Sequence, residues 1–152
     1  MNFFKIKRKI LLSFVLPIPY KKLRTFALKE SGFDIGNQVY IGQGLTLTLG
    51  YCDRNMKLLI EDRVSIAPNV TIVLASHPNH SKLCKIVKSP PRKVIICADS
   101  WIGTGVIIMP GVTIGECSIV GAGSVVTHDI PPYTISVGNP AKVIKEIDRS
   151  LL

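Results

Sequence analysis

The sequence predicts an all-β solenoid with a short N-terminal helix, because a six-residue repeat runs through most of the chain and one segment interrupts it. Over the longest stretch an aliphatic residue returns at every sixth position without a slip: Ile96, Ile102, Ile108, Ile114, Val120 and Val126. The position four residues after each aliphatic is small or β-branched: Ser100, Val106, Val112, Ser118 and Ser124. A period of six fits neither an amphipathic helix nor an alternating strand, but it fits a triangular coil in which each hexapeptide forms one side and one corner.

The alternative of a β-sandwich is disfavoured, because its turns recur about every 8 to 12 residues. Two earlier blocks extend the repeat toward the N-terminus: Ile35, Ile41 and Leu47, then Ile60, Ile66 and Ile72. The two blocks are one residue out of phase. We therefore predict a single inserted residue between Leu47 and Ile60, in a turn near residues 50–55.

A helix is predicted over Tyr20 to Ser31, where residues at three- and four-residue spacing form one face and Gly32 follows as a stop signal. This helix should dock on the first coil. The predicted organisation is a basic arm and helix over residues 1–31, followed by one β-helix domain over residues 32–147 with a tail to 152.

The formal charge of +9 is concentrated in the N-terminal arm. Residues 1–30 contain eight of the nineteen Lys and Arg and one acid, Glu30, which leaves only +2 for the rest of the chain. This distribution disfavours a nucleic-acid-binding face and suits peripheral contact with a membrane surface or an acidic partner. The apolar run from Ile10 to Leu16 is too short to span a bilayer and has no convincing cleavage site after it. We expect a cytoplasmic protein, with the inner face of the membrane as one option for the arm.

The cysteines are scattered, without the spacing of a zinc site: Cys52, Cys84, Cys97 and Cys117. We interpret them as reduced thiols, with Cys97 and Cys117 as small, buried residues of the repeat, and we expect no bound metal.

The repeat stops over Ala75 to Lys93, which contains three prolines and should form a loop thrown out of the solenoid. The loop contains His77, His80 and five basic residues, and no acid. Loops held by a rigid scaffold are where binding and catalytic residues concentrate. The candidate site should therefore include this loop.

An ordered set of motifs resembles the maltose and galactoside O-acetyltransferase branch of the hexapeptide-repeat acyltransferases: Ser65-Ile-Ala-Pro-Asn-Val-Thr71, Ser76-His77-Pro78, Trp101-Ile-Gly103, Pro110-Gly-Val-Thr-Ile-Gly115, Gly121-Ala-Gly-Ser-Val-Val-Thr127 and Gly138-Asn-Pro-Ala141. The resemblance covers residues 35 to 147. It implies a left-handed parallel β-helix, a homotrimer with active sites between subunits, and acetyl-CoA as cosubstrate without a metal.

By the same resemblance, His77 matches the catalytic histidine of the family. Imidazole suits this role, because it exchanges protons near neutral pH and the attack of a hydroxyl on a thioester needs a base. His80 is a weaker candidate for contact with the acceptor. Trp101 is either a core or subunit-interface residue or part of the cleft.

The contacts to acetyl-CoA that the resemblance implies are Thr104, Ala122, Thr127, His128, Lys142 and Lys145. Relatives tend to have Lys at position 128 and Arg at positions 142 and 145. Because lysine pairs with phosphate as a point charge, the two lysines should hold the nucleotide less firmly than arginines would. A zinc-dependent carbonic anhydrase of the same fold is disfavoured, because His77, His80 and His128 do not have that family's spacing.

The expected function is O-acetylation of a sugar hydroxyl in a bacterial polysaccharide or glycan precursor. A basic, apolar N-terminal helix is typical of family members that modify such surface glycans. Two alternatives stay open: N-acetylation of an amino sugar or a xenobiotic, and a non-catalytic β-helix that acts as a binding module.

Overall fold

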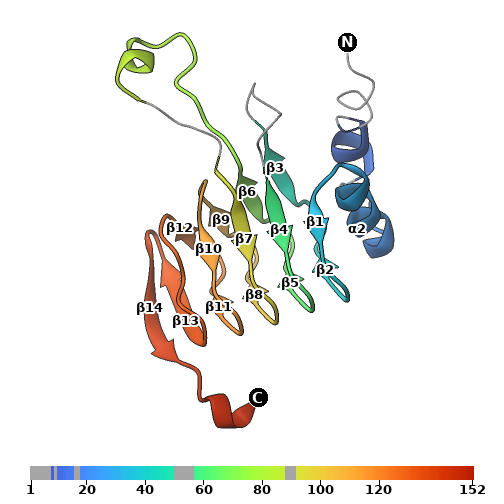
Figure 1. Cartoon of the computed structure of the whole chain (residues 1–152), viewed down its shortest axis with the longest axis vertical. Coiled ribbons are helices and arrows are strands. Elements are labelled where there is room, and N and C mark those ends of the chain that lie inside the picture. The colour runs from blue at the N-terminus through green and yellow to red at the C-terminus, as the bar shows by residue number, and fades with distance from the viewer. Residues whose placement is uncertain (1–7, 9, 16–17, 50–56, 88–91) are drawn as a thin grey trace.

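The computed structural model describes residues 8, 10–15, 18–49, 57–87 and 92–152, and these form three parallel sheets wound into a single stack of coils (Figure 1). In spatial order, sheet A contains β1 (Asp34–Ile35), β4 (Leu58–Ile60), β7 (Val94–Ile96) and β10 (Thr113–Ile114). Sheet B contains β2 (Tyr40–Ile41), β5 (Ser65–Ile66), β8 (Trp101–Ile102), β11 (Ile119–Val120), β13 (Thr134–Gly138) and the antiparallel β14 (Ala141–Glu146). Sheet C contains β3 (Thr46–Thr48), β6 (Thr71–Val73), β9 (Ile107–Ile108) and β12 (Val125–Val126).

The predicted repeat is confirmed, because the aliphatic residues at six-residue spacing point inward and stack in three columns. The fully buried members are Ile41, Ile60, Ile66, Ile72, Ile96, Ile102, Ile108, Ile114, Val120 and Val126. The chain visits sheets A, B and C in turn, so each coil adds one residue to each column. The result is one continuous aliphatic core along the axis of the stack.

The serines of the repeat donate their hydroxyls to backbone carbonyls at the corners. Ser118 donates its hydroxyl to the Gly115 carbonyl at 2.6 Å, and Ser124 donates to Gly121 at 2.7 Å. Both serines are buried. A small hydroxyl residue at the fourth position thus closes the corner through a hydrogen bond to the carbonyl three residues earlier.

The corner between sheets A and B has the same left-handed backbone in every coil. Its residues have φ between 51° and 60°: Gln38, Arg63, Asp99, Cys117 and Tyr133. The corner between sheets B and C uses Gly44, Asn69, Gly105 and Gly123 in the same way, with φ between 60° and 76°. A tight corner every six residues needs one left-handed residue, and this explains why the strands are so short.

The predicted insertion before Ile60 is wrong in size. Ile35 pairs with Ile60, 25 residues later, whereas Ile96 pairs with Ile114, 18 residues later. Leu47 in sheet C and Ile60 in sheet A lie on neighbouring sides, so their thirteen-residue step exceeds a hexapeptide by seven residues. The insertion therefore contains seven extra residues rather than one; residues 50–56 lie outside the described part of the chain.

The predicted helix is α2 (Lys21–Glu30), and it packs against β1 and β2 of the first coil as expected. A π-helical turn, η1 (Leu11–Val15), precedes it and packs against it. Arg24 of α2 points inward, where its guanidinium donates to the carbonyls of Ile41 at 2.9 Å and Ile18 at 2.6 Å. Arg8 is also buried and lies over the ring of Phe33. Two of the basic residues in the arm thus hold the helix to the first coil instead of facing solvent.

The described helices are all too short or too polar to cross a bilayer. At the other end of the stack, Ile130 bridges to Ile114 and closes the last coil early, before the β13–β14 hairpin and η3 (Arg149–Leu151).

Candidate functional site

The predicted extruded loop leaves the solenoid after β6 and returns at β7, and Figure 1 shows it projecting well away from the coils. It contains the short 3-10 helix η2 (Lys82–Lys85), in which no residue is buried. The helix begins at Ser81, whose hydroxyl accepts a hydrogen bond from the Leu83 amide at 3.2 Å. The loop therefore has local order without a hydrophobic core of its own.

His77 lies at the base of this loop, three residues after the buried Leu74 of the last coil position, and it is half-buried. Within the described residues its ring makes no hydrogen bond or ion pair. His80 lies further out and is exposed. His77 is thus fixed by the scaffold at its backbone, while its ring nitrogens stay available to a ligand.

Two of the predicted donor-binding residues share the edge between sheets C and A with His77. Thr127 and His128 directly follow β12, two strands along sheet C from β6. Both side chains are exposed, and the Thr127 hydroxyl and His128 Nδ1 lie 2.8 Å apart. We refer to this line of corners as the C-to-A edge.

Two other predicted residues lie on a different edge of the solenoid, between sheets B and C. Thr104 follows β8 and Ala122 follows β11, and both are exposed. Beside them, Gly105 and Gly123 have a φ of 70°, and a Cβ atom added to either would meet no atom within 4 Å. This B-to-C edge is therefore an open surface lined by small residues, to which an extended ligand can come close.

The outer face of sheet B contains the rest of the predicted site. Trp101 is 54% exposed, so the interpretation of this residue as part of the core is wrong. Lys142 and Lys145 lie on β14 at the far end of the same sheet, and both are exposed. The chain thus places the predicted site residues on two edges and one face, and a single chain does not bring His77 together with Thr104 and Ala122.

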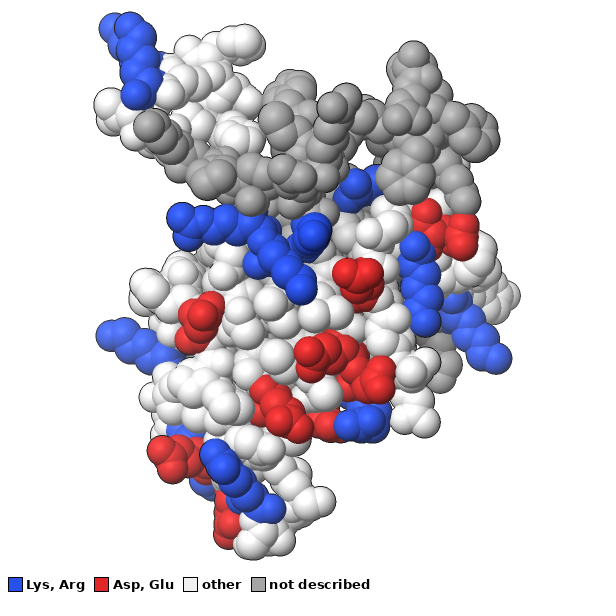
Figure 2. All heavy atoms as spheres, viewed as in Figure 1, with Lys and Arg blue, Asp and Glu red and all other residues white. Residues whose placement is uncertain are grey.

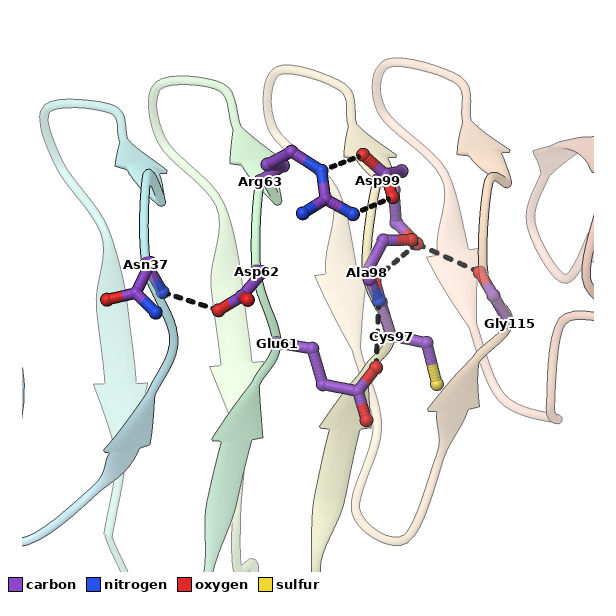
Figure 3. A network of polar contacts seen from close by, with 9 residues as sticks. Asn37, Glu61, Asp62, Arg63, Cys97, Ala98, Asp99 and Gly115 are labelled. Atoms are coloured by element: carbon purple, nitrogen blue, oxygen red, sulfur yellow. Dashed lines mark hydrogen bonds and ion pairs between the residues drawn. The ribbon is translucent and has the colours of Figure 1, made fainter. Parts of the chain in front are cut away.

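The corner between sheets A and B forms a polar network that the sequence analysis missed (Figure 3). Arg63 donates two hydrogen bonds to the Asp99 carboxylate, at 2.7 and 2.6 Å. The Glu61 carboxylate accepts a hydrogen bond from the backbone amide of Ala98 at 2.9 Å, and the Asp62 carboxylate accepts one from the backbone amide of Asn37. Figure 2 shows acidic side chains gathered on this face of the molecule. Acids that recur at the corner positions of successive repeats were the available signal.

Arg63 lowers the pKa of Asp99, chiefly through their hydrogen bonds. Asp99, Glu116 and Cys117 each place one potential metal-binding atom within 4.8 Å of the others. Arg63 already binds both oxygens of Asp99, so we interpret Asp99 as an ion-pair partner and not as a metal ligand. Cys97 and Cys117 are only partly buried, contrary to the prediction, and burial raises the pKa of both thiols.

Comparison with known proteins identifies the family to which the repeat belongs. Residues 93–128 match the model of the bacterial transferase hexapeptide family (six repeats). A crystal structure of a maltose O-acetyltransferase from Clostridium difficile 630 is 34% identical, with a TM-score of 0.66 over 97% of this chain and 86% of that chain. The chain belongs to the hexapeptide-repeat acetyltransferase family. Its fold is accordingly the left-handed parallel β-helix that the resemblance implied, in agreement with the solenoid that the repeat predicted.

Two other members of the family are informative. A galactoside acetyltransferase solved in complex with coenzyme A has a TM-score of 0.63 and is 29% identical, over 97% of this chain and 80% of that chain. The galactoside O-acetyltransferase of Escherichia coli K12 is 42% identical over 118 residues, which is 78% of this chain and 56% of the relative. The chain therefore spans little more than half the length of this curated relative.

Proposed function

We propose that the protein is an acetyl-CoA-dependent O-acetyltransferase that modifies a sugar hydroxyl of a bacterial polysaccharide or glycan precursor. The observation that carries the proposal is the interruption of the β-helix by a loop with His77 at its base, in a chain whose relatives include sugar O-acetyltransferases. The scaffold alone would suit many functions, because a fold does not determine an activity.

The open B-to-C edge fits the pantetheine arm of acetyl-CoA. Gly105 and Gly123 remove side-chain obstruction, and the exposed Thr104 and Ala122 lie next to them. Lys142 and Lys145, at the end of sheet B, can pair with the phosphates of the nucleotide. When bound, acetyl-CoA supplies the acetyl group as an activated thioester.

His77 would act as general base in a direct transfer. Its free ring nitrogen takes the proton of the acceptor hydroxyl while the hydroxyl oxygen forms a bond to the acetyl carbon. As the bond between that carbon and sulfur breaks, His77 returns the proton to the departing sulfur. The products are the O-acetylated sugar and the free thiol of CoA, and no acyl group is attached to the protein.

A complete site needs more than one copy of the chain. His77, Thr127 and His128 lie on the C-to-A edge, whereas Thr104 and Ala122 lie on the B-to-C edge. We propose a homotrimer in which the C-to-A edge of one subunit faces the B-to-C edge and sheet B of the next. His80 and Trp101 would then lie at the acceptor side of the cleft.

The direct test is incubation with acetyl-CoA and a panel of glycans, with the release of CoA measured by a thiol reagent. We expect turnover with hydroxyl acceptors, and a loss of about 10²- to 10⁴-fold in His77→Ala, because general-base catalysis contributes about this much. Lys82→Ala, which changes an exposed residue of η2 in the same loop, is the matched control. Unchanged turnover in His77→Ala would refute the catalytic role, and activity toward amines alone would refute O-acetylation.

A further inference from the structure

A cavity of about 500 Å³ lies between α2 and the first coil, outside the predicted donor-binding edges. On the helix side it is lined by Lys22, Phe26 and Lys29, which follow one another at four- and three-residue spacing and therefore share one face of α2. The opposite face of the helix is occupied by the buried Arg24 and Leu28. The packing of α2 on the solenoid thus directs two lysines and an aromatic ring into the groove.

Amide and aromatic side chains line the other wall of the groove. Asn37 and Gln38 lie in the first corner between sheets A and B, and Tyr40 begins β2. The side chains of Gln38 and Tyr40 are both exposed, and Tyr40 retains 43% of its accessible surface. Aromatic rings beside amide groups offer stacking surfaces together with hydrogen-bond donors and acceptors, a combination that suits a sugar ring.

The charged residues in the lining of the groove are both positive, and acidic residues line the adjoining pocket. The lining of the groove contains two cations, Lys22 and Lys29, and no Asp or Glu. Among the residues that the structure describes, neither lysine forms an ion pair or a hydrogen bond through its side-chain ammonium group. The helix side of the groove therefore attracts an anionic group, whereas Asp34, Glu61 and Asp62 line the adjoining pocket, which shares Lys29 and Gly36 with the groove.

The groove opens onto the face of sheet B on which Trp101 lies. Tyr40 pairs with Ser65, and Ser65 pairs with Trp101. Because Ile41, Ile66 and Ile102 point inward, the residues before them all point outward. Two strand spacings of about 4.8 Å place Tyr40 and Trp101 about 10 Å apart along this face. An extended chain of sugars can follow this row from the predicted site to the groove.

We propose that the groove between α2 and the first coil is an acceptor subsite for a carboxylate-bearing sugar, so that the protein prefers an anionic oligosaccharide or polysaccharide. The inference rests on the proposed function and specifies its acceptor. Lys22 and Lys29 pair with the carboxylate, Phe26 and Tyr40 hold the sugar ring, and the next sugars lead along sheet B to Trp101. A bilayer surface fits this groove less well than a sugar does, because the basic and aromatic residues line a concave groove with amide groups on its far wall.

Trp101 is the only tryptophan of the chain, so its fluorescence reports binding on this face without any acetyl transfer. The protein is titrated at low salt with tetragalacturonate, and with neutral maltotetraose for comparison. We expect tetragalacturonate to bind more tightly, and to bind less tightly as salt screens the lysines. Lys22→Gln/Lys29→Gln should raise the Kd for tetragalacturonate about tenfold and leave that for maltotetraose unchanged, since each exposed ion pair contributes about threefold.

Lys57→Gln/Lys93→Gln is the matched control, because these two exposed lysines precede the paired strands β4 and β7 and lie outside the groove. It should keep the wild-type Kd. Phe26→Ala provides a second test that removes no charge, and it should weaken the binding of both oligosaccharides.

Three outcomes would overturn the proposal: an equal Kd for tetragalacturonate in the two double-lysine variants, a lysine-dependent affinity for phosphatidylglycerol vesicles without oligosaccharide binding, or a changed oligomeric mass in Lys22→Gln/Lys29→Gln. The last would identify the groove as a contact between copies. Binding without any release of CoA from acetyl-CoA would refute the proposed function but keep the subsite. Turnover with neutral acceptors and no binding of tetragalacturonate would refute the subsite alone.

Discussion

Arg63 and Asp99 occupy the same corner position in two successive coils, and both have a left-handed backbone, with φ of 57° and 60°. The shared conformation aligns the two side chains so that Nε and Nη2 of Arg63 each meet one oxygen of Asp99. The pair links two adjacent coils at a corner, beside the backbone hydrogen bond from the Asp99 amide to the Asp62 carbonyl.

The stabilisation from this ion pair should depend on pH. The pKa of Asp99 is lowered in the folded protein, so its contribution is present above the unfolded value of about 4 and is lost as the pH falls through the lowered value. Asp99→Asn should therefore be slightly less stable than wild type at pH 7 and equally stable in strong acid. Urea unfolding followed by circular dichroism at both pH values checks this.

Asp34→Asn is the control for that experiment, because Asp34 makes no ion pair within the described residues. It should have the wild-type stability at pH 7. An Asp99→Asn deficit that persists unchanged at low pH would contradict the assignment of the effect to the charged pair.

A truncated side chain in the aliphatic columns should lower the free energy of unfolding more than a truncated side chain on the surface. Ile108 is fully buried in the column of sheet C, whereas its neighbour Ile107 in β9 is 37% exposed. Ile108→Ala should lower the free energy of unfolding by about 2–5 kcal/mol. Ile107→Ala should cost about 1 kcal/mol or less. Equal losses in a urea titration would argue against the stacked core as the main source of stability.

Two glycines of the B-to-C edge should respond differently to alanine. At Gly103 an added Cβ would lie 2.6 Å from the Ala122 amide nitrogen and 2.8 Å from the Val120 carbonyl oxygen. Both are backbone atoms, which cannot move aside as a flexible side chain can. Gly105 has open space, so Gly105→Ala should cost only the strain of its left-handed backbone, about 1–2 kcal/mol. Thermal unfolding should therefore rank Gly103→Ala as the less stable variant.

Gly105→Ala should also raise the KM for acetyl-CoA, because the new methyl group protrudes into the predicted path of the pantetheine arm. Gly32→Ala is the control for strain, since Gly32 has a similar φ of 81° and lies after α2, away from this edge. A KM change of the same size in both variants would mean that the effect comes from strain and not from obstruction of the B-to-C edge.

The two lysines of β14 should act on the nucleotide part of the donor. Lys142→Gln/Lys145→Gln should raise the KM for acetyl-CoA about tenfold through the loss of two exposed charge pairs. S-acetylpantetheine lacks the nucleotide, so its KM should be unaffected. An equal rise for both donors would place the lysines elsewhere in the mechanism.

The repeat predicted the sides of the solenoid because inward positions are decided by burial, which a six-residue period records directly. It could not size the first insertion. Steps of thirteen residues fit two hexapeptides with one extra residue as well as one hexapeptide with seven, and only the pairing of Ile35 with Ile60 distinguishes them. The shortened last coil was not predicted either. Ile130 follows Val126 by four residues instead of six, so the residue that pairs with Ile114 does not keep the six-residue spacing.

The candidate site was predicted less completely than the fold. The interruption of the repeat identified the loop of His77, but no period in one chain reveals which edge of a second copy it would meet. The burial of the Arg24 side chain was also not predicted, because a basic residue on an amphipathic helix is ordinarily assigned to the solvent side. The groove beside Phe26 depends on the packing of α2 against the first coil, which local sequence does not specify.

Both insertions lie between a strand of sheet C and the next strand of sheet A, at β3 to β4 and at β6 to β7. The strands on either side of each insertion stay in register with their neighbours, so chain length can change there without disturbing the stack. Evolution can therefore lengthen, shorten or exchange the loop of His77 while the corners between sheets B and C keep their shape. If Thr104 and Ala122 bind the donor as proposed, the acceptor specificity can change independently of that part of the donor site.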